Sequence, residues 1–193
     1  MRLNFPRFLI LALALLTGVF AMPASSTAAS RPLDPENTLY LDLPMGRVVI
    51  DMRPDLAPHT VARIKHLVRE HFYDGLTFHR VIPGFMAQGG DPKGDGTGGS
   101  GQKLKAEFSD APFVRGTVAM ARAASPDSAD SQFFICLAAA PWLDGQYTVW
   151  GQVVSGMEYV DEIKKGSQAN NGTVIDPTHI VKMEIAADID KKK

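Results

Sequence analysis

The sequence has little of what disulfide or metal chemistry requires. It contains one cysteine, Cys136, in 193 residues, so the fold cannot depend on a disulfide within the chain. Cys136 lies in the apolar run 133–137, where a lone thiol is expected to pack as a small hydrophobic side chain. The histidines form no HExxH pattern. The sequence therefore predicts neither a metal site nor a cofactor.

A surplus of positive charge is also missing. The chain carries 20 Lys and Arg against 21 Asp and Glu, for a formal net charge of −1. Nucleic-acid-binding domains usually concentrate basic residues on one face, so nucleic acid is not an expected partner. The length of 193 residues suits one domain with a sizeable core, and no repeat or second domain is visible.

No hydrophobic run reaches the roughly 20 residues that a membrane-spanning helix needs. The apolar run 8–21 follows Arg2 and Arg7 and precedes the small residues of 24–29. This order is typical of a secretory signal peptide, so residues 1–29 are predicted to be removed by cleavage after about residue 24 to 29. The mature chain is then expected to be free of the membrane, in the periplasm or secreted. A permanent anchor is the alternative.

Alternation of apolar and polar residues predicts several short strands. Residues 38–43 and 46–52 are expected to form a hairpin, and further strands are predicted at 113–122, 131–137, 147–154 and 179–186. Helical spacing predicts two helices, one that begins at Pro58 and ends before residues 73–75, and one over residues 157–165. Many strands with only two helices favour an antiparallel barrel or sandwich.

The most unusual stretch is FHRVIPGFMAQGG, residues 78–90. One arginine, Arg80, stands among apolar residues, and Pro83-Gly84 separates two runs of strand length. Side chains alternate across each run, but a turn at Pro83-Gly84 could re-aim the faces. The alternation alone therefore leaves open which side chains converge. Arg80 has either a functional role or, as the alternative, a salt bridge to a carboxylate.

The segment FHRVIPGFMAQGGD resembles the signature of the cyclophilin family of peptidyl-prolyl cis–trans isomerases. Two later stretches agree with it: VAMARA followed by SQFFI, in residues 118–135, and WLDG at 142–145. With the predicted signal peptide, the resemblance is to exported cyclophilins of the bacterial periplasm. It implies a closed eight-stranded antiparallel β-barrel capped by two α-helices. This single isomerase domain would occupy residues 30–190, followed by the lysine tail 191–193.

The resemblance implies an enzyme that accelerates rotation about the peptide bond before proline. That rotation has a barrier of ~18–20 kcal/mol and takes tens to hundreds of seconds unaided. It needs no covalent intermediate. As the amide twists, its nitrogen becomes pyramidal and gains a lone pair, to which a guanidinium can donate a hydrogen bond. Arg80 would then bind the twisted state more strongly than the planar one.

The site implied by the resemblance has a catalytic group and a wall that binds the substrate. The resemblance implies three catalytic residues, namely Arg80, Phe85 and Gln88. The substrate-binding residues are Met86, Ala121, Arg122, Gln132, Phe134, Trp142, Leu143 and Tyr147. Arg122 is expected to act through its backbone. Animal cytosolic members carry asparagine in place of Arg122 and histidine in place of Tyr147, so preference beyond proline is expected to differ.

The expected partners are proline-containing polypeptides, namely exported proteins that are unfolded or still folding. The protein itself is expected to be a monomer. Trp142 resembles the tryptophan of members that bind the cyclic peptide cyclosporin, so cyclosporin is an expected inhibitor. The alternative class is a non-enzymatic module that grips proline segments. A hydrolase that uses His79 is disfavoured, because no serine or cysteine is placed as its partner.

Residues 91–101 contain a literal GxGxxG pattern at Gly96, Gly98 and Gly101. A dinucleotide site needs a strand directly before this pattern and a helix directly after it. A turn-rich segment precedes it here, and no helical spacing follows. The sequence therefore favours a loop that lines the edge of a peptide groove over a nucleotide site.

Overall fold

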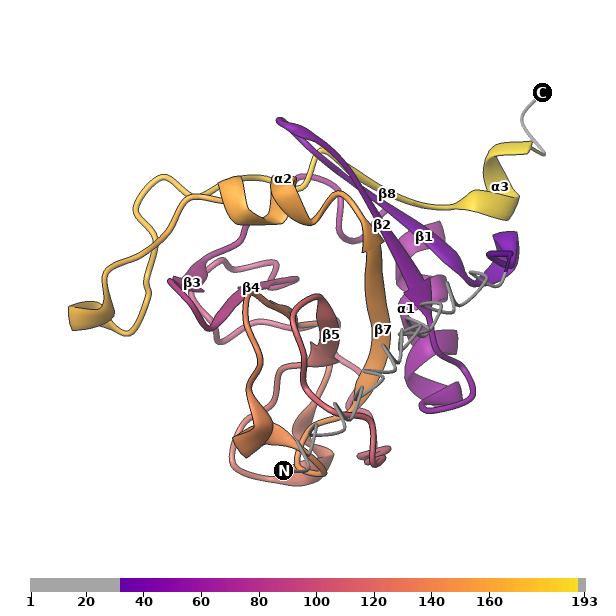
Figure 1. The fold of residues 1–193 in the computed structure, drawn as a ribbon, viewed down its shortest axis with the longest axis horizontal. Coiled ribbons are helices and arrows are strands. Elements are labelled where there is room, and N and C mark those ends of the chain that lie inside the picture. The colour runs from indigo at the N-terminus through magenta and orange to yellow at the C-terminus, as the bar shows by residue number, and fades with distance from the viewer. Residues whose placement is uncertain (1–31, 191–193) are drawn as a thin grey trace, which may run out of the picture. The chain divides into compact units, whose positions relative to one another are not determined.

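The fold, given by a computed structural model that describes residues 32–190, is mainly β. Its sheet has eight antiparallel strands: β1 (Thr38–Leu43), β2 (Gly46–Met52), β3 (Arg80–Ile82), β4 (Met86–Gly89), β5 (Thr117–Met120), β6 (Phe133–Cys136), β7 (Val149–Ser155) and β8 (Lys182–Ile185). The strands lie in the order β3-β4-β6-β5-β7-β2-β1-β8 (Figure 1). The predicted signal peptide and the lysine tail lie outside the described residues.

The sheet curls but stays open, which corrects the predicted closed barrel. β3 and β8 are its two edges, and within residues 32–190 no ladder of hydrogen bonds joins them. Instead, residues 163–181 between α2 and β8, which we call the spanning segment, bond to β3 and to the residues just before it. The Phe78 N–H donates to the Thr178 carbonyl at 3.0 Å, and the Val81 N–H donates to the Gly172 carbonyl at 2.8 Å. The result is a curled half-barrel whose gap is spanned by irregular chain.

The backbone of the spanning segment explains why it forms no ninth strand. Asn171 and Asp176 have φ angles of 56° and 52°, in the left-handed region that strands do not use. Pro177 has no N–H to donate to a ladder. Closure by a continuous ladder of hydrogen bonds is therefore not available to this sequence.

The hairpin β1–β2 has the bounds that alternation predicts. Leu39 and Leu41 on β1, and Val48 and Ile50 on β2, are all fully buried. Every second residue enters the core because side chains alternate across a strand. The strands β5, β6 and β8 are shorter than the predicted 113–122, 131–137 and 179–186. Register shifts interrupt the ladders of β7 with β2 and β5.

The inner face of the sheet carries the main core, and Phe133 lies at its centre. The Phe133 ring meets three others edge-on, with centroid distances of 5.8 Å to Tyr73, 6.1 Å to Phe78 and 5.9 Å to Trp150. Edge-to-face packing is a favoured arrangement for aromatic rings. Phe133 is fully buried, and its neighbour Phe134 alternates to the outer face.

Residues 32–190 form three α-helices, where the sequence predicted two: α1 (Pro58–Arg69), α2 (Met157–Glu162) and α3 (Ala186–Asp190). α1 begins at the predicted proline, and its first turn is capped by a distant side chain. The Glu107 carboxylate accepts the backbone N–H groups of His59 and Thr60 at 3.0 and 2.8 Å. α3 was not predicted; its Asp188 accepts a hydrogen bond from Arg69 Nε on α1 at 2.8 Å.

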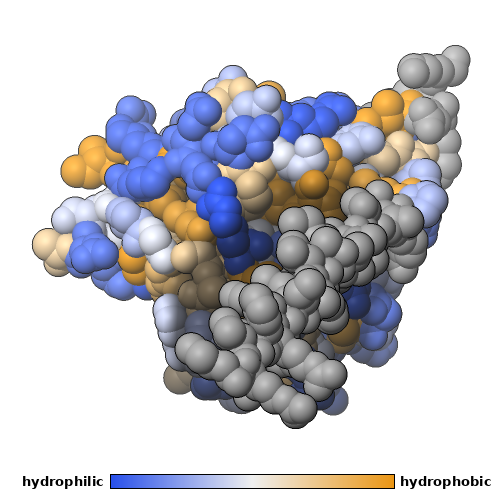
Figure 2. Space-filling model, in the orientation of Figure 1, coloured by the Kyte–Doolittle hydropathy of each residue, from blue (hydrophilic) through white to orange (hydrophobic). Residues whose placement is uncertain are grey.

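Exposed apolar side chains of the described chain are spread over several elements. On the face drawn in Figure 2, apolar residues reach the surface in small patches that hydrophilic residues interrupt. Single exposed hydrophobic residues are normal in folded proteins. In the described part of the chain, no helix has the length and apolar character to cross a bilayer.

Gly156 joins β7 to α2 in a left-handed conformation, and its replacement tests how this junction packs. Its φ is +82°, and an added Cβ would collide with the backbone of Arg47 and Val48. We expect Gly156→Ala to lower the free energy of unfolding by more than the roughly 1–2 kcal/mol that a left-handed backbone costs an L-residue. Urea denaturation measures this loss.

The matched control is Gly145→Ala. Gly145 has a φ of +68°, but no atom lies within 4 Å of an added Cβ. Its substitution therefore carries the backbone cost without the collision. Equal losses of stability in the two variants would contradict the packing argument.

Candidate active site

The hairpin β3–β4 decides which side chains of the 78–90 motif converge. Arg80 lies directly opposite Gln88, and Met86 follows on the same face of the hairpin. Val81 and Ala87 alternate to the other face and are fully buried in the main core. One face of this hairpin therefore stabilises the fold, and the other presents a guanidinium, an amide and a thioether together.

Apolar side chains on the outer face of the sheet form a floor beside Arg80. Phe134 on β6 lies opposite Gln88. Its ring stacks on Phe113 at 6.1 Å and meets Tyr147 edge-on at 5.9 Å. We call this group the outer cluster; its buried members are Met86, Phe113, Ala119, Phe134, Cys136, Ala140, Leu143 and Val149. Burial raises the pKa of the Cys136 thiol to about 12, which leaves it unreactive at neutral pH.

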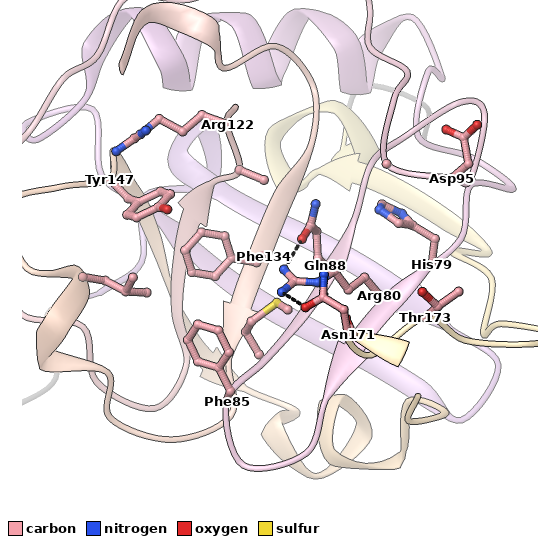
Figure 3. A pocket seen from close by; sticks show the side chains of 15 residues that line it. His79, Arg80, Phe85, Gln88, Asp95, Arg122, Phe134, Tyr147, Asn171 and Thr173 are labelled. Atoms are coloured by element: carbon pink, nitrogen blue, oxygen red, sulfur yellow. Dashed lines mark hydrogen bonds between the residues drawn. The ribbon is translucent and has the colours of Figure 1, made fainter. Parts of the chain in front are cut away.

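A groove with a volume of about 510 Å³ opens over the outer cluster. The predicted site residues that line it are Arg80, Phe85, Met86, Gln88, Ala121, Arg122, Phe134, Leu143 and Tyr147 (Figure 3). The other lining residues are His79, Gly94, Asp95, Gly96, Asn171 and Thr173. The volume is in the usual range for a small-ligand site.

Two predicted site residues lie outside the lining of this groove. Gln132 is buried behind Gln88, whose Nε2 donates to Gln132 Oε1 at 2.9 Å. Trp142 is 60% exposed. Its ring lies 5.7 Å from the ring of Phe85, so that it extends the rim of the groove. Gln132 is thus connected to Arg80 through Gln88, and Trp142 lies at the rim of the groove beside Phe85.

A chain of hydrogen bonds fixes the orientation of both glutamine amides. Gln132 Nε2 donates to the carbonyls of Gly96 and Gly98 at 3.0 and 2.9 Å. Its Oε1 is therefore the atom that accepts from Gln88, and Gln88 must turn its own Oε1 toward Arg80. A guanidinium can only donate, so this is the orientation that Arg80 requires.

Arg80 is held by neutral oxygen atoms. Its Nη1 donates to Gln88 Oε1 at 3.0 Å, its Nε to the Asn171 carbonyl at 3.0 Å, and its Nη2 to Asn171 Oδ1 at 2.9 Å. A guanidinium has five N–H groups, so one on each terminal nitrogen is left for a ligand. Partial burial lowers the pKa of Arg80, yet arginine stays charged in proteins.

The alternative reading of Arg80, a salt bridge, is not what the structure has. No carboxylate among residues 32–190 pairs with its guanidinium; the three bonds go to amide and carbonyl oxygens. The charge therefore faces the groove without an anion to neutralise it.

Known proteins resemble this chain in sequence. Residues 38–185 match the family described as cyclophilin type peptidyl-prolyl cis-trans isomerase. The chain belongs to this family. It is 55% identical over 180 residues to a probable peptidyl-prolyl cis-trans isomerase of Brucella suis, which covers 87% of this chain and 92% of the relative. It is 46% identical over 123 residues to peptidyl-prolyl cis-trans isomerase B of Bacillus subtilis, covering 63% and 85%.

Solved structures agree with the sequence relatives. A cyclophilin of Hirschia baltica superposes with a TM-score of 0.73 at 26% identity, covering 82% of this chain and 77% of that one. A cyclophilin-type isomerase of Cryptosporidium parvum, crystallised in the presence of the dipeptide Ala-Pro, has a TM-score of 0.70 at 26% identity, covering 77% and 98%. The predicted family and enzyme class are confirmed: this cyclophilin is a peptidyl-prolyl cis–trans isomerase.

The side chain of Arg122 in this cyclophilin does more than the sequence led us to expect. Its guanidinium lies 4.5 Å from the centre of the Tyr147 ring. It donates to the carbonyls of Ala123 and Ala124 through Nη1, and to that of Gln146 through Nε and Nη2. Arg122 thus ties the loop after β5 to the turn before β7, at one end of the groove (Figure 3).

His79 and Asp95 stand at the other end of the groove (Figure 3). His79 is only 6% exposed, and neither ring nitrogen has a hydrogen-bond partner in the described chain. Burial lowers the pKa of His79, so its ring is neutral at pH 7. Hydrogen bonds from Thr97 keep the pKa of Asp95 low. Without a bonded serine or cysteine, His79 lacks the partner that a hydrolase requires.

The glycine-rich loop 91–101 of this cyclophilin forms the edge of the groove, as expected for a peptide-lining loop. The buried Asp91 carboxylate accepts the backbone N–H groups of Lys93, Asp95 and Gly96. No helix begins between Gly101 and β5, so the nucleotide-binding context is missing. Among residues 32–190, no group of three His, Cys, Asp or Glu side chains is arranged to hold a metal ion.

Asn171 is the residue in contact with Arg80 that the sequence did not predict; Gly94, Asp95 and Thr173 also line the groove without having been predicted. The sequence indicates only a turn there, from the pair Asn171-Gly172, which tolerates left-handed backbone. That local signal says nothing of the contact with Arg80, which lies 91 residues earlier in the chain. An interaction over this separation depends on how the spanning segment folds back across β3.

Proposed function

We propose that Arg80 is the catalytic group of this isomerase, and that its substrates are proline-containing segments of exported proteins. The observation that carries the catalytic proposal is the charged guanidinium with free N–H groups beside the apolar outer cluster. The apolar floor suits the proline ring, and the free donors suit the amide next to it. The Ala-Pro dipeptide named with the Cryptosporidium parvum enzyme supports a ligand of this chemistry.

The guanidinium would act on the nitrogen of the peptide bond before proline. In the planar amide this nitrogen shares its electron pair with the carbonyl, and it becomes an acceptor only as the bond twists. A donor aimed at the nitrogen therefore stabilises the transition state more than the ground state. Reaching about 10 turnovers per second requires roughly 4 kcal/mol of stabilisation. One or two charge-assisted hydrogen bonds in a sheltered groove can supply that amount.

The rest of the groove would orient the substrate. Phe85, Phe134 and Leu143 offer an apolar surface to the proline ring. The Ala121 N–H already donates to the Gln132 carbonyl at 2.9 Å. A substrate strand would therefore pair with the carbonyl of Ala121 and not with its N–H.

Replacement of Arg80 tests the catalytic proposal. We expect Arg80→Ala to lower kcat/KM by at least about tenfold in a coupled proline-peptide assay, because the donor to the twisted nitrogen is lost. Arg80→Lys should restore little, since a single ammonium cannot replace the planar fork. Circular dichroism of both variants checks that the fold is intact. Full activity of a folded Arg80→Ala variant would overturn the mechanism.

Export is proposed from the predicted signal peptide in residues 1–29. In a Gram-negative host we expect a processed protein in the periplasm, with an N-terminus between Ser25 and Ser30. Cell fractionation followed by N-terminal sequencing checks this. A membrane-bound product that still begins at Met1 would favour an uncleaved anchor.

Cyclosporin inhibition is proposed from Trp142 at the rim. Its indole is exposed and carries an N–H donor that phenylalanine lacks. We expect sub-micromolar inhibition, and we expect Trp142→Phe to weaken binding by about 1–3 kcal/mol, the cost of leaving one partner unpaired. Turnover of a short proline peptide should change much less, because Trp142 lies outside the groove lining. Equal affinity of both proteins in a titration would make Trp142 a structural residue.

A further inference from the structure

One residue holds Arg80 along a whole edge of its guanidinium. Asn171 accepts the Nε hydrogen through its backbone carbonyl at 3.0 Å and an Nη2 hydrogen through Oδ1 at 2.9 Å. The two hydrogens lie on the same edge of the planar group, so the contact is bidentate. Figure 3 shows the half of it that involves the Asn171 side chain. Gln88 supplies the third contact, at Nη1.

The bidentate contact fixes the plane of the guanidinium. A single hydrogen bond to Gln88 would leave the group free to rotate about the last torsions of the side chain. Two acceptors on one edge remove that freedom and so determine the direction of the remaining N–H groups. The rate of a reaction that depends on a donor aimed at one nitrogen falls steeply when the donor is misplaced.

Asn171 is itself held by the backbone next to Arg80. The Val81 N–H donates to the Gly172 carbonyl at 2.8 Å, and the Val81 carbonyl accepts the Gly166 N–H at 3.0 Å. The left-handed backbone of Asn171, with φ 56° and ψ 29°, then turns both of its oxygens toward the guanidinium. Asparagine is one of the few residues that adopt this conformation readily.

We propose that Asn171 is a positioning residue for proline isomerisation and acts through Arg80. The proposal rests on the catalytic role of Arg80 stated above. Asn171 lines the groove, but both of its oxygens accept hydrogen bonds from Arg80, so we expect its removal to slow the chemical step more than it weakens binding. The segment that spans the open edge of the sheet thereby contributes to catalysis.

Asn171→Gly separates the two contacts. Glycine keeps the left-handed backbone and the carbonyl that accepts from Nε, and it removes only the Oδ1 contact. We expect kcat to fall roughly ten- to hundredfold, the equivalent of one hydrogen bond to a charged group, with KM changed less than about twofold. The exposed neighbour Asn170, whose side chain does not contact Arg80, gives the control Asn170→Ala, which should keep wild-type kcat.

A double-mutant cycle distinguishes positioning from a purely structural role. Arg80→Lys replaces the planar guanidinium with a tetrahedral ammonium, which has no flat edge to match the two oxygens of Asn171. In that background Asn171→Gly should therefore cost little further activity. An equal fold-loss in both backgrounds would show that Asn171 acts through the stability of the fold, and would overturn the proposal. Thermal unfolding of each variant accompanies the kinetics.

The outcomes also separate this proposal from the one on which it rests. If Arg80→Ala keeps full activity, the catalytic role of Arg80 is wrong whatever Asn171 does. If Arg80→Ala loses activity while Asn171→Gly keeps wild-type kcat, only the positioning role of Asn171 is wrong.

Discussion

The site depends on the positively charged guanidinium of Arg80, which is held by hydrogen bonds to neutral oxygen atoms and not by a carboxylate. Every oxygen that binds Arg80 belongs to an amide or a carbonyl. A carboxylate would hold the guanidinium more tightly, but its charge would compete with the weakly basic nitrogen of a twisting amide. Neutral acceptors fix the orientation of the guanidinium and leave its charge available to the amide nitrogen of the substrate. The glutamine chain behind Arg80 is needed for this reason, because each amide must present its oxygen and not its NH₂ group.

The alternation of side chains across strands lets one sheet serve two purposes. On β4 and β6, every second residue enters the main core while its neighbours build the floor of the groove. Phe133 and Phe134 are adjacent, yet one is the centre of the core and the other faces the ligand space. The groove is therefore as rigid as the sheet that carries it, which is what a reaction governed by orientation requires.

Local pattern was enough to predict part of this molecule. The hairpin β1–β2 and the start of α1 follow from alternation and from Pro58, since these signals lie within a few residues of the structure they determine. The closed barrel was implied by the family resemblance, and it was wrong because β3 and β8 do not pair: the segment between α2 and β8 has a left-handed backbone at Asn171 and Asp176. α3 is a single short turn after β8, too brief to show helical spacing.

Most of the predicted site residues line one groove, but the contacts between them were not predictable from the sequence. Arg80 and Gln88 are close in sequence, and the motif that carries the family resemblance names both. The bond from Arg80 to Asn171 and the clasp of Arg122 on Gln146 join distant or irregular segments. The acceptors for Arg80 and Arg122 include backbone carbonyls. Because every residue has a backbone carbonyl, the sequence does not indicate which one will accept.

The segment that spans the gap of the open sheet has one more consequence, which concerns solubility. An edge strand with unpaired backbone groups invites any extended chain to add to the sheet. On β3, the outward N–H and carbonyl of Val81 are both taken by Gly172 and Gly166. A peptidyl-prolyl isomerase binds peptide segments, and an extended segment could pair with an open strand edge. Covering this edge keeps such chains from adding to the sheet as an extra strand, and leaves them the groove.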